Sequence, residues 1–137
     1  METSILNIYH IFILLILIGF TASIVYYFNV ADTQHPDEKG KIPIMNFKTR
    51  GVIGLVRYSW PIIRVAAYEN FIIISYRKKL IRFYYNEISL KESSFLLIKS
   101  LKFQHNKTEY PNNIEILDSD NFNLFIELMK KKSVYFS

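Results

Sequence analysis

The stretch that decides the fold is IYHIFILLILIGFTASIVYYFNV, residues 8–30, which contains no Asp, Glu, Lys or Arg. At about 1.5 Å per residue, a helix over this stretch reaches roughly 34 Å, and the hydrocarbon core of a bilayer is about 30 Å thick. A single helix also forms all of its own backbone hydrogen bonds, which lipid cannot supply. The sequence therefore predicts an N-terminal tail and one transmembrane helix over residues 1–30.

Two features of this stretch bear on its role. The small residues Gly19, Ala22 and Ser23 form a candidate helix–helix contact, because small side chains let two membrane helices approach closely; ordinary helix composition is the alternative explanation. For the whole stretch the alternative is a cleaved signal peptide. A signal peptide is disfavoured because Glu2 is the only charged side chain before the apolar run, which is also longer than a usual signal-peptide core.

The positive charges predict the orientation of the helix. No Lys or Arg precedes it, whereas Lys39, Lys41, Lys48 and Arg50 follow it within about twenty residues. The positive-inside rule then places the N-terminus outside and the remaining chain in the cytoplasm. The chain contains no cysteine, which agrees with a reducing compartment.

A change in composition marks the domain boundaries. Residues 31–44, ADTQHPDEKGKIPI, are predicted to form a linker because Pro36, Gly40 and Pro43 interrupt regular structure. We expect this linker to give the following domain some reach from the bilayer without a fixed angle. Residues 45–137 have the size of one small domain.

Short apolar runs separated by turn residues follow the linker. The expected strands are GVIGLVRY (51–58), IIRVAA (62–67), FIIISY (71–76), LIRFYY (80–85), FLLIKS (95–100), LKFQH (101–105) and IEIL (114–117). We expect a break at residues 59–61, and residues 45–50 stay ambiguous. Strands at intervals of roughly 8–12 residues predict a small antiparallel barrel or sandwich of about seven strands.

The chain ends with a helical pattern. Asp118, Ser119 and Asp120 offer capping oxygens. Apolar residues then recur at helical spacing, with lysines in the last turn: Phe122, Phe125, Ile126, Met129 and Lys130, Lys131, Lys132. The predicted fold class is therefore α+β, in which a transmembrane helix precedes a β-barrel or sandwich that a C-terminal amphipathic helix caps.

This order of elements resembles the pleckstrin-homology-like (PH-like) domain in its small bacterial form. The resemblance covers residues 60–132 and rests on WPIIRV (60–65), the hairpin YENFIII (68–74), the stretch 80–88 with YNEI (85–88), and the capped helix. It implies a barrel that a helix plugs and that binds lipid headgroups or peptides, and such domains are rarely enzymes. Phosphoinositide-binding members carry a basic cluster in the loop between their first two strands. In this chain we expect the corresponding loop to contain Ser59, Trp60 and Pro61.

Catalytic and metal-binding motifs are missing from the sequence. His10, His35 and His105 lie far apart and no cysteine accompanies them, so a zinc site lacks ligands. The sequence contains neither a glycine-rich phosphate loop nor a nucleophile elbow. We therefore expect no enzyme, no cofactor and no metal. The net charge of +5 is too small an excess to favour a nucleic-acid partner.

Arg77, Lys78, Lys79 and Arg82 form the candidate surface site. At a strand end near a bilayer, each cation contributes about 1 kcal/mol to the binding of anionic lipid. The alternative is a solvated turn beside an edge strand that its charges protect from aggregation.

These observations predict a non-enzymatic single-pass protein of a bacterial inner membrane. We expect an accessory or scaffold subunit whose cytoplasmic PH-like domain binds protein and whose helix docks on another membrane protein or complex. Two alternatives stay open. One is a membrane-surface sensor that binds anionic lipid, and the other is a small inner-membrane inhibitor or immunity factor.

Overall fold

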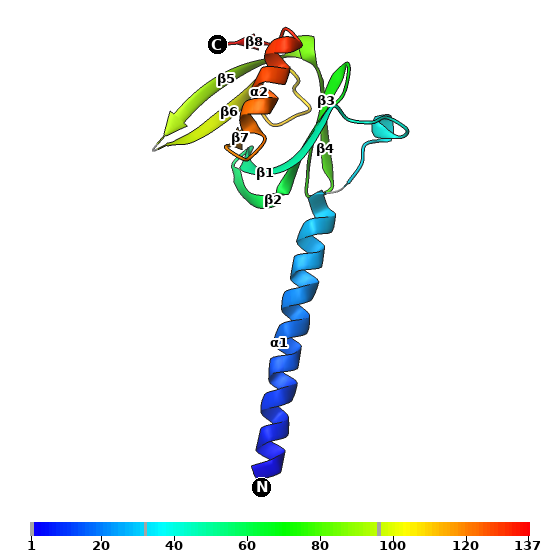
Figure 1. Cartoon of the computed structure of the whole chain (residues 1–137), viewed down its shortest axis with the longest axis vertical. Helices are drawn as coiled ribbons and strands as arrows, with labels where there is room; N and C mark the ends of the chain where they lie inside the picture. The colour runs from blue at the N-terminus through cyan, green and yellow to red at the C-terminus, as the bar shows by residue number, and fades with distance from the viewer. Residues whose placement is uncertain (1, 32, 96) are drawn as a thin grey trace.

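The computed structural model describes residues 2–31, 33–95 and 97–137 (Figure 1). Residues 1, 32 and 96, which belong to the predicted tail, linker and fifth strand, lie outside this part. A long helix, α1 (Glu2–Ala31), projects from a curled β-sheet, and a short helix, α2 (Phe122–Lys131), lies against the sheet. The predicted α+β class is confirmed, and the sheet is a half-barrel.

The described residues form an eight-stranded sheet in the order β4-β3-β2-β1-β7-β6-β5-β8. All neighbouring strands are antiparallel except β5 and β8, which pair in parallel. The strands are β1 (Met45–Ile53), β2 (Val56–Ala67), β3 (Phe71–Tyr76), β4 (Lys79–Tyr84), β5 (Ile88–Phe95), β6 (Ile98–His105), β7 (Ile114–Leu117) and β8 (Tyr135–Phe136). Two 3-10 helices, η1 (Pro36–Glu38) and η2 (Tyr85–Glu87), connect elements.

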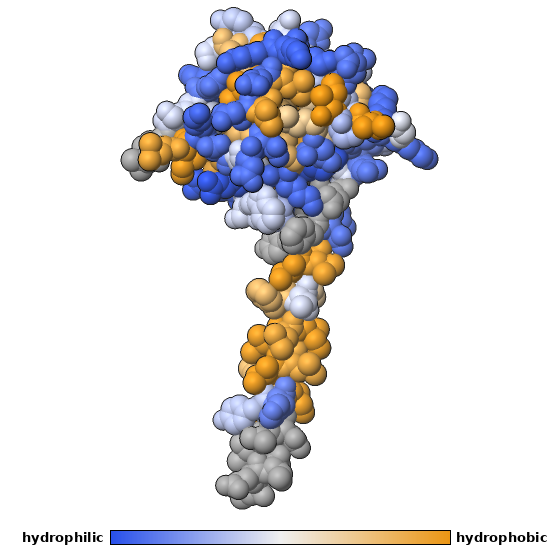
Figure 2. All heavy atoms as spheres, in the orientation of Figure 1, coloured by the Kyte–Doolittle hydropathy of each residue, from blue (hydrophilic) through white to orange (hydrophobic). Residues whose placement is uncertain are grey.

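Helix α1 is long and apolar enough to cross a membrane or to act as a signal sequence over Ile8–Tyr26. None of this segment is buried by the half-barrel, and Figure 2 shows it as a largely orange surface below a domain that is mostly blue near the helix. The hydroxyls of Thr21 and Ser23 donate to the carbonyls of Leu17 and Gly19 at 2.9 and 2.8 Å. The polar side chains of Thr21 and Ser23 therefore find partners within the helix.

Three predicted strand boundaries are wrong. The stretch 51–58 contains the β1–β2 turn, because Gly54 adopts a φ of +65°, and β1 begins in the ambiguous stretch, at Met45. The predicted strands 95–100 and 101–105 are largely one strand, β6, and β5 was not among the predicted strands. Leu97 has a φ of +69° in the β5–β6 turn, where no Gly or Asn marks the turn in the sequence.

The predicted break at residues 59–61 is an irregularity inside β2. Thr49 of β1 lies opposite Ile63 and Gly51 lies opposite Tyr58, so Arg50 alone opposes the stretch 59–62. The extra residues bulge from the sheet, and Trp60 is 58% exposed. Residues 59–61 therefore do not form the loop between the first two strands, which consists of Gly54 and Leu55.

Helix α2 covers the concave face of the half-barrel (Figure 1). The ring of Phe125 lies 5.5 Å from that of Phe47 and 6.3 Å from that of Phe103. Its buried stripe is the predicted one, Phe122, Phe125, Ile126 and Met129. The N-cap differs from the prediction: it is Asn121, whose side chain makes no capping hydrogen bond.

Strand β3 is buried on both faces. One face, with Ile72 and Ile74, belongs to the main core, and the other face, with Phe71 and Ile73, belongs to a second small cluster. This explains why the sequence FIIISY is a continuous apolar run, since a strand with one solvated face shows alternation. Something outside the half-barrel must therefore cover β3.

We expect Gly51→Ala to lower the free energy of unfolding by more than about 2 kcal/mol, because a new Cβ would lie 2.1 Å from the carbonyl oxygen of Glu115 in β7. Chemical denaturation of the full-length protein in detergent measures this change. Gly19→Ala is the control, because a Cβ there has nothing within 4 Å. Equal stabilities of the two variants would contradict the β1–β7 register.

Candidate functional site

The predicted linker is docked on the half-barrel. We call residues 33–44 the strap. Within it, Glu38 is only 4% exposed, and its carboxylate accepts from Arg64 Nη2 at 2.7 and 2.8 Å and from the hydroxyl of Tyr68 at 2.7 Å. Arg64, in β2, is 5% exposed. A buried carboxylate and a buried guanidinium are tolerated because each neutralises the other.

Further contacts complete this ionic cluster. Arg64 Nε donates to Ser75 Oγ at 3.1 Å, and its Nη2 donates to the carbonyl of Thr33 at 3.2 Å. Burial and the hydrogen bond to Glu38 raise the pKa of Tyr68 to about 12, so this phenol stays a donor at physiological pH. The strap, with Lys41 Nζ 4.8 Å from the ring centre of Phe71, lies on the outer face of β2 and β3.

The strap also fixes the half-barrel against α1. Helix α1 ends at Ala31, and the carbonyl of Thr33 already belongs to the ionic cluster. The C-terminal part of α1 contacts β2 and β3 directly. The expected linker with reach and no fixed angle is therefore wrong, because Asp37 and Glu38 have a half-buried and a buried partner on the sheet, respectively.

The structure brings together three of the four predicted basic residues. Arg77, Lys78 and Lys79 are exposed at the β3–β4 turn, where Arg77 and Lys78 have φ values of +44° and +65°. Arg82 is half-buried in β4 and forms an ion pair with Asp37 of the strap. The sequence cannot reveal this pairing, because Asp37 lies far from Arg82 along the chain.

A crevice lies between the end of α1 and β2. It has a volume of about 510 Å³ and contains two arginines, Arg57 and Arg77. Its other lining residues are Ile24, Val56, Tyr58, Ser59, Trp60, Pro61 and Ile62, so none of the described lining residues is acidic. Arg57 was not predicted as a site residue, because its place beside α1 depends on how the strap orients the helix.

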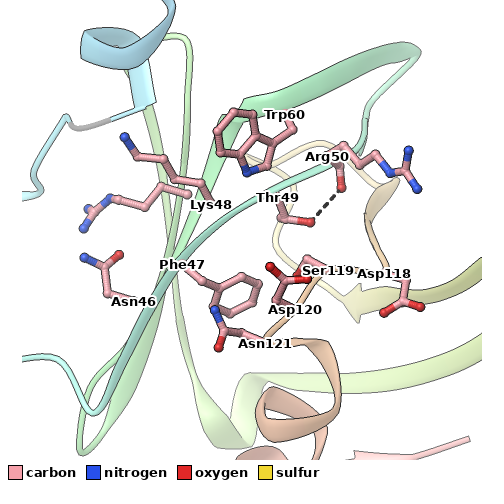
Figure 3. A pocket seen from close by; sticks show the side chains of 11 residues that line it. Asn46, Phe47, Lys48, Thr49, Arg50, Trp60, Asp118, Ser119, Asp120 and Asn121 are labelled. Atoms are coloured by element: carbon pink, nitrogen blue, oxygen red, sulfur yellow. Dashed lines mark hydrogen bonds between the residues drawn. The ribbon is translucent and has the colours of Figure 1, made fainter.

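A second cavity, of about 570 Å³, is a groove between β1 and the loop 118–121 (Figure 3). Figure 3 shows the indole of Trp60 on one side, and the acidic side chains of Asp118 and Asp120 on the loop below β1. Lys48 and Arg50 supply the opposite charge. The residues predicted as helix caps therefore line this groove.

Two hydroxyl groups line the groove, those of Thr49 and Ser119. Thr49 Oγ1 donates to the carbonyl of Leu117 at 2.9 Å, and its second contact, to the carbonyl of Arg50, is dashed in Figure 3. Ser119 Oγ is buried without a hydrogen-bond partner. The described lining residues include no histidine and no cysteine.

The predicted helix contact, Gly19, Ala22 and Ser23, lies on the exposed surface of α1. The space next to Gly19 is open, since a Cβ there would meet nothing within 4 Å. These residues thus leave room for a second helix, and the prediction of a helix–helix contact stays a prediction.

The histidine of the half-barrel has a packing role. His105 Nε2 lies 2.9 Å from the carbonyl of Pro111, its Nδ1 accepts from the backbone of Lys107 at 3.2 Å, and its ring packs on Phe83. Among residues 2–31, 33–95 and 97–137, no three His, Asp or Glu side chains gather in a group that could hold a metal ion.

Comparison of the chain with protein-family models, with curated proteins and with solved structures finds no match. What the half-barrel binds must therefore follow from its own geometry.

We expect Glu38→Gln to lower the free energy of unfolding by about 3 kcal/mol, because it leaves the buried charge of Arg64 without its counter-ion. It should also release the strap, so that trypsin cleaves faster after the exposed residues Lys39 and Lys41. The matched control is Glu109→Gln, which removes an exposed carboxylate from the loop 106–113. Equal cleavage rates in the two variants would show that the ion pair does not hold the strap.

Proposed function

We propose that this chain is a non-enzymatic, single-pass membrane protein whose half-barrel is a PH-like domain that binds another protein at the cytoplasmic membrane surface. In this role it is an accessory or scaffold subunit. The observation that carries the proposal is the docked strap, which holds the half-barrel directly at the end of an apolar helix.

The properties of helix α1 support the proposal that it is a retained membrane anchor. Its segment Ile8–Tyr26 exposes its apolar side chains to the surroundings, a state that water disfavours and lipid favours. A cleaved signal sequence has no reason to pack on the mature domain, yet the end of α1 contacts β2 and β3. Lys39, Lys41, Lys48 and Arg50 all lie on the domain side, which favours a cytoplasmic half-barrel.

The sheet topology supports the PH-like assignment. Four antiparallel strands, β1 to β4, and three more, β5 to β7, precede a single helix, and Phe125 of that helix fills the concave face. This is the arrangement that the resemblance implies, namely a barrel plugged by a C-terminal helix. Such a domain is a binding module.

The groove between β1 and the loop 118–121 is the surface best suited to a protein partner. It combines an exposed indole, Trp60, with cations on β1 and with Asp118 and Asp120. Tryptophan and arginine dominate the energetics of many protein interfaces, and paired charges of both signs select the partner.

A quantitative pull-down from gently solubilised membranes tests the proposal. We expect the full-length chain to capture a membrane protein in stoichiometric amounts. Asp118→Asn/Asp120→Asn should lower the yield at least about tenfold, since losing two interfacial charge contacts removes about 1.4 kcal/mol or more. The control Glu109→Gln/Glu127→Gln removes two exposed carboxylates elsewhere and should keep the yield.

A third variant, in which an unrelated apolar helix replaces residues 1–30, locates the contact. A partner that disappears with this exchange is recognised by α1, and one that stays is recognised by the half-barrel. If the full-length chain captures no protein, the proposed accessory role is wrong.

A further inference from the structure

The crevice between α1 and β2 opens beside the C-terminal part of the apolar run 8–30. Ile24 forms part of its wall and belongs to the candidate span Ile8–Tyr26. At about 1.5 Å per residue, Ile24 lies roughly 9 Å before Val30, where the uncharged run 8–30 ends. With α1 in a membrane, one wall of the crevice therefore begins in hydrocarbon, and the rest lies at the depth of the lipid headgroups.

The side chains of the crevice match this boundary. Val56 and Trp60 are exposed apolar groups, and Leu55, at the tip of the β1–β2 turn, is fully exposed. Trp favours the interface between lipid and water, where its ring meets acyl chains and its N–H meets polar groups. The half-barrel would otherwise present these apolar side chains to water.

The charge in the crevice is of one sign. Arg57 and Arg77 are both exposed and both line it, and none of its described lining residues is acidic. The groove next to it differs, because Asp118 and Asp120 line it together with its cations. Guanidinium groups form paired hydrogen bonds to phosphate oxygens, so two of them beside an apolar wall suit a phosphate that carries acyl chains.

We propose that this crevice binds one anionic phospholipid of the bilayer, with its phosphate on Arg57 and Arg77 and its acyl chains along α1. The volume of about 510 Å³ lies in the range of small-molecule sites and accommodates a headgroup. The inference rests on the proposed function only in requiring α1 to be a membrane anchor.

This site differs from the basic turn that the sequence suggested as a lipid site, and from the loop that binds phosphoinositides in PH-like domains. The β1–β2 loop, where phosphoinositide-binding PH-like domains carry their basic cluster, consists of Gly54 and Leu55 and holds no cation. The basic turn contributes Arg77, but Lys78 and Lys79 do not line the crevice. Replacing these two lysines by neutral residues removes as much charge as replacing Arg57 and Arg77, so the lysine variant serves as the control.

The only tryptophan of the chain, Trp60, lines the crevice and reports its occupant. We would reconstitute the full-length protein in phosphatidylcholine vesicles that contain two test lipids, phosphatidylglycerol and phosphatidylcholine, in equal mole fractions. In one preparation the phosphatidylglycerol test lipid is brominated, and in the other the phosphatidylcholine test lipid is brominated. Brominated phosphatidylglycerol should quench Trp60 more strongly than brominated phosphatidylcholine. Arg57→Gln/Arg77→Gln should lower this preference at least about fivefold, and Lys78→Gln/Lys79→Gln should keep it.

Equal quenching by the two lipids in the wild-type protein would overturn the inference. So would an equal loss of preference in the two double variants, which indicates diffuse attraction of lipid to a basic surface. Because Arg77 lies over the ring of Tyr58 at 5.7 Å, a melting curve accompanies each variant. If the double variant is unfolded, the single variant Arg57→Gln replaces it and must lower the preference while Arg57→Lys retains more of it.

The failures of the two proposals are distinguishable. A protein that does not float with the vesicles, and whose Trp60 neither lipid quenches, lacks a membrane anchor, which overturns both proposals. A protein that floats with the vesicles and shows no lipid preference overturns only the lipid site. A lipid preference without a captured protein partner overturns only the accessory role.

Discussion

The buried ion pair between Glu38 and Arg64 determines how the helix and the half-barrel are placed relative to each other. Removing either partner leaves an uncompensated charge in a site that is at least nine-tenths buried, which is strongly unfavourable. The pair also holds Thr33, the second residue after α1, through Arg64. Without this cluster a flexible segment would join the two parts, and the crevice between α1 and β2 would have no defined walls.

The same strap divides the basic residues into two groups with different roles. Asp37 pairs with Arg82, so this cation stabilises the position of η1 and is unavailable to a ligand. Arg77 lies in the β3–β4 turn and lines the crevice with Arg57. Cations that lie within six residues of one another in sequence are therefore separated in the structure: Arg82 pairs with the strap, and Arg77 lines the crevice.

Local sequence signals explain which parts of the fold could be predicted. The apolar run of α1, the helical stripe of α2 and the polar turn between β2 and β3 are local signals, and the structure confirms a long apolar helix, the stripe and the turn. The β5–β6 turn carries Leu97 in a left-handed conformation that the surrounding strands impose, so no local residue type marks it. The strap depends on Glu38 and Arg64, which are 26 residues apart, and only the folded sheet brings them together.

Trp60 links the crevice and the groove, because it lines both cavities. It reaches both because the bulge in β2 pushes residues 59–62 out of register with β1. A ligand in either cavity therefore contacts a side chain that forms the wall of the other. Any effect of one ligand on the affinity for the second must be matched by an equal effect in the reverse direction. The bulge thus places one indole where the proposed lipid and the proposed partner protein would contact the same side chain.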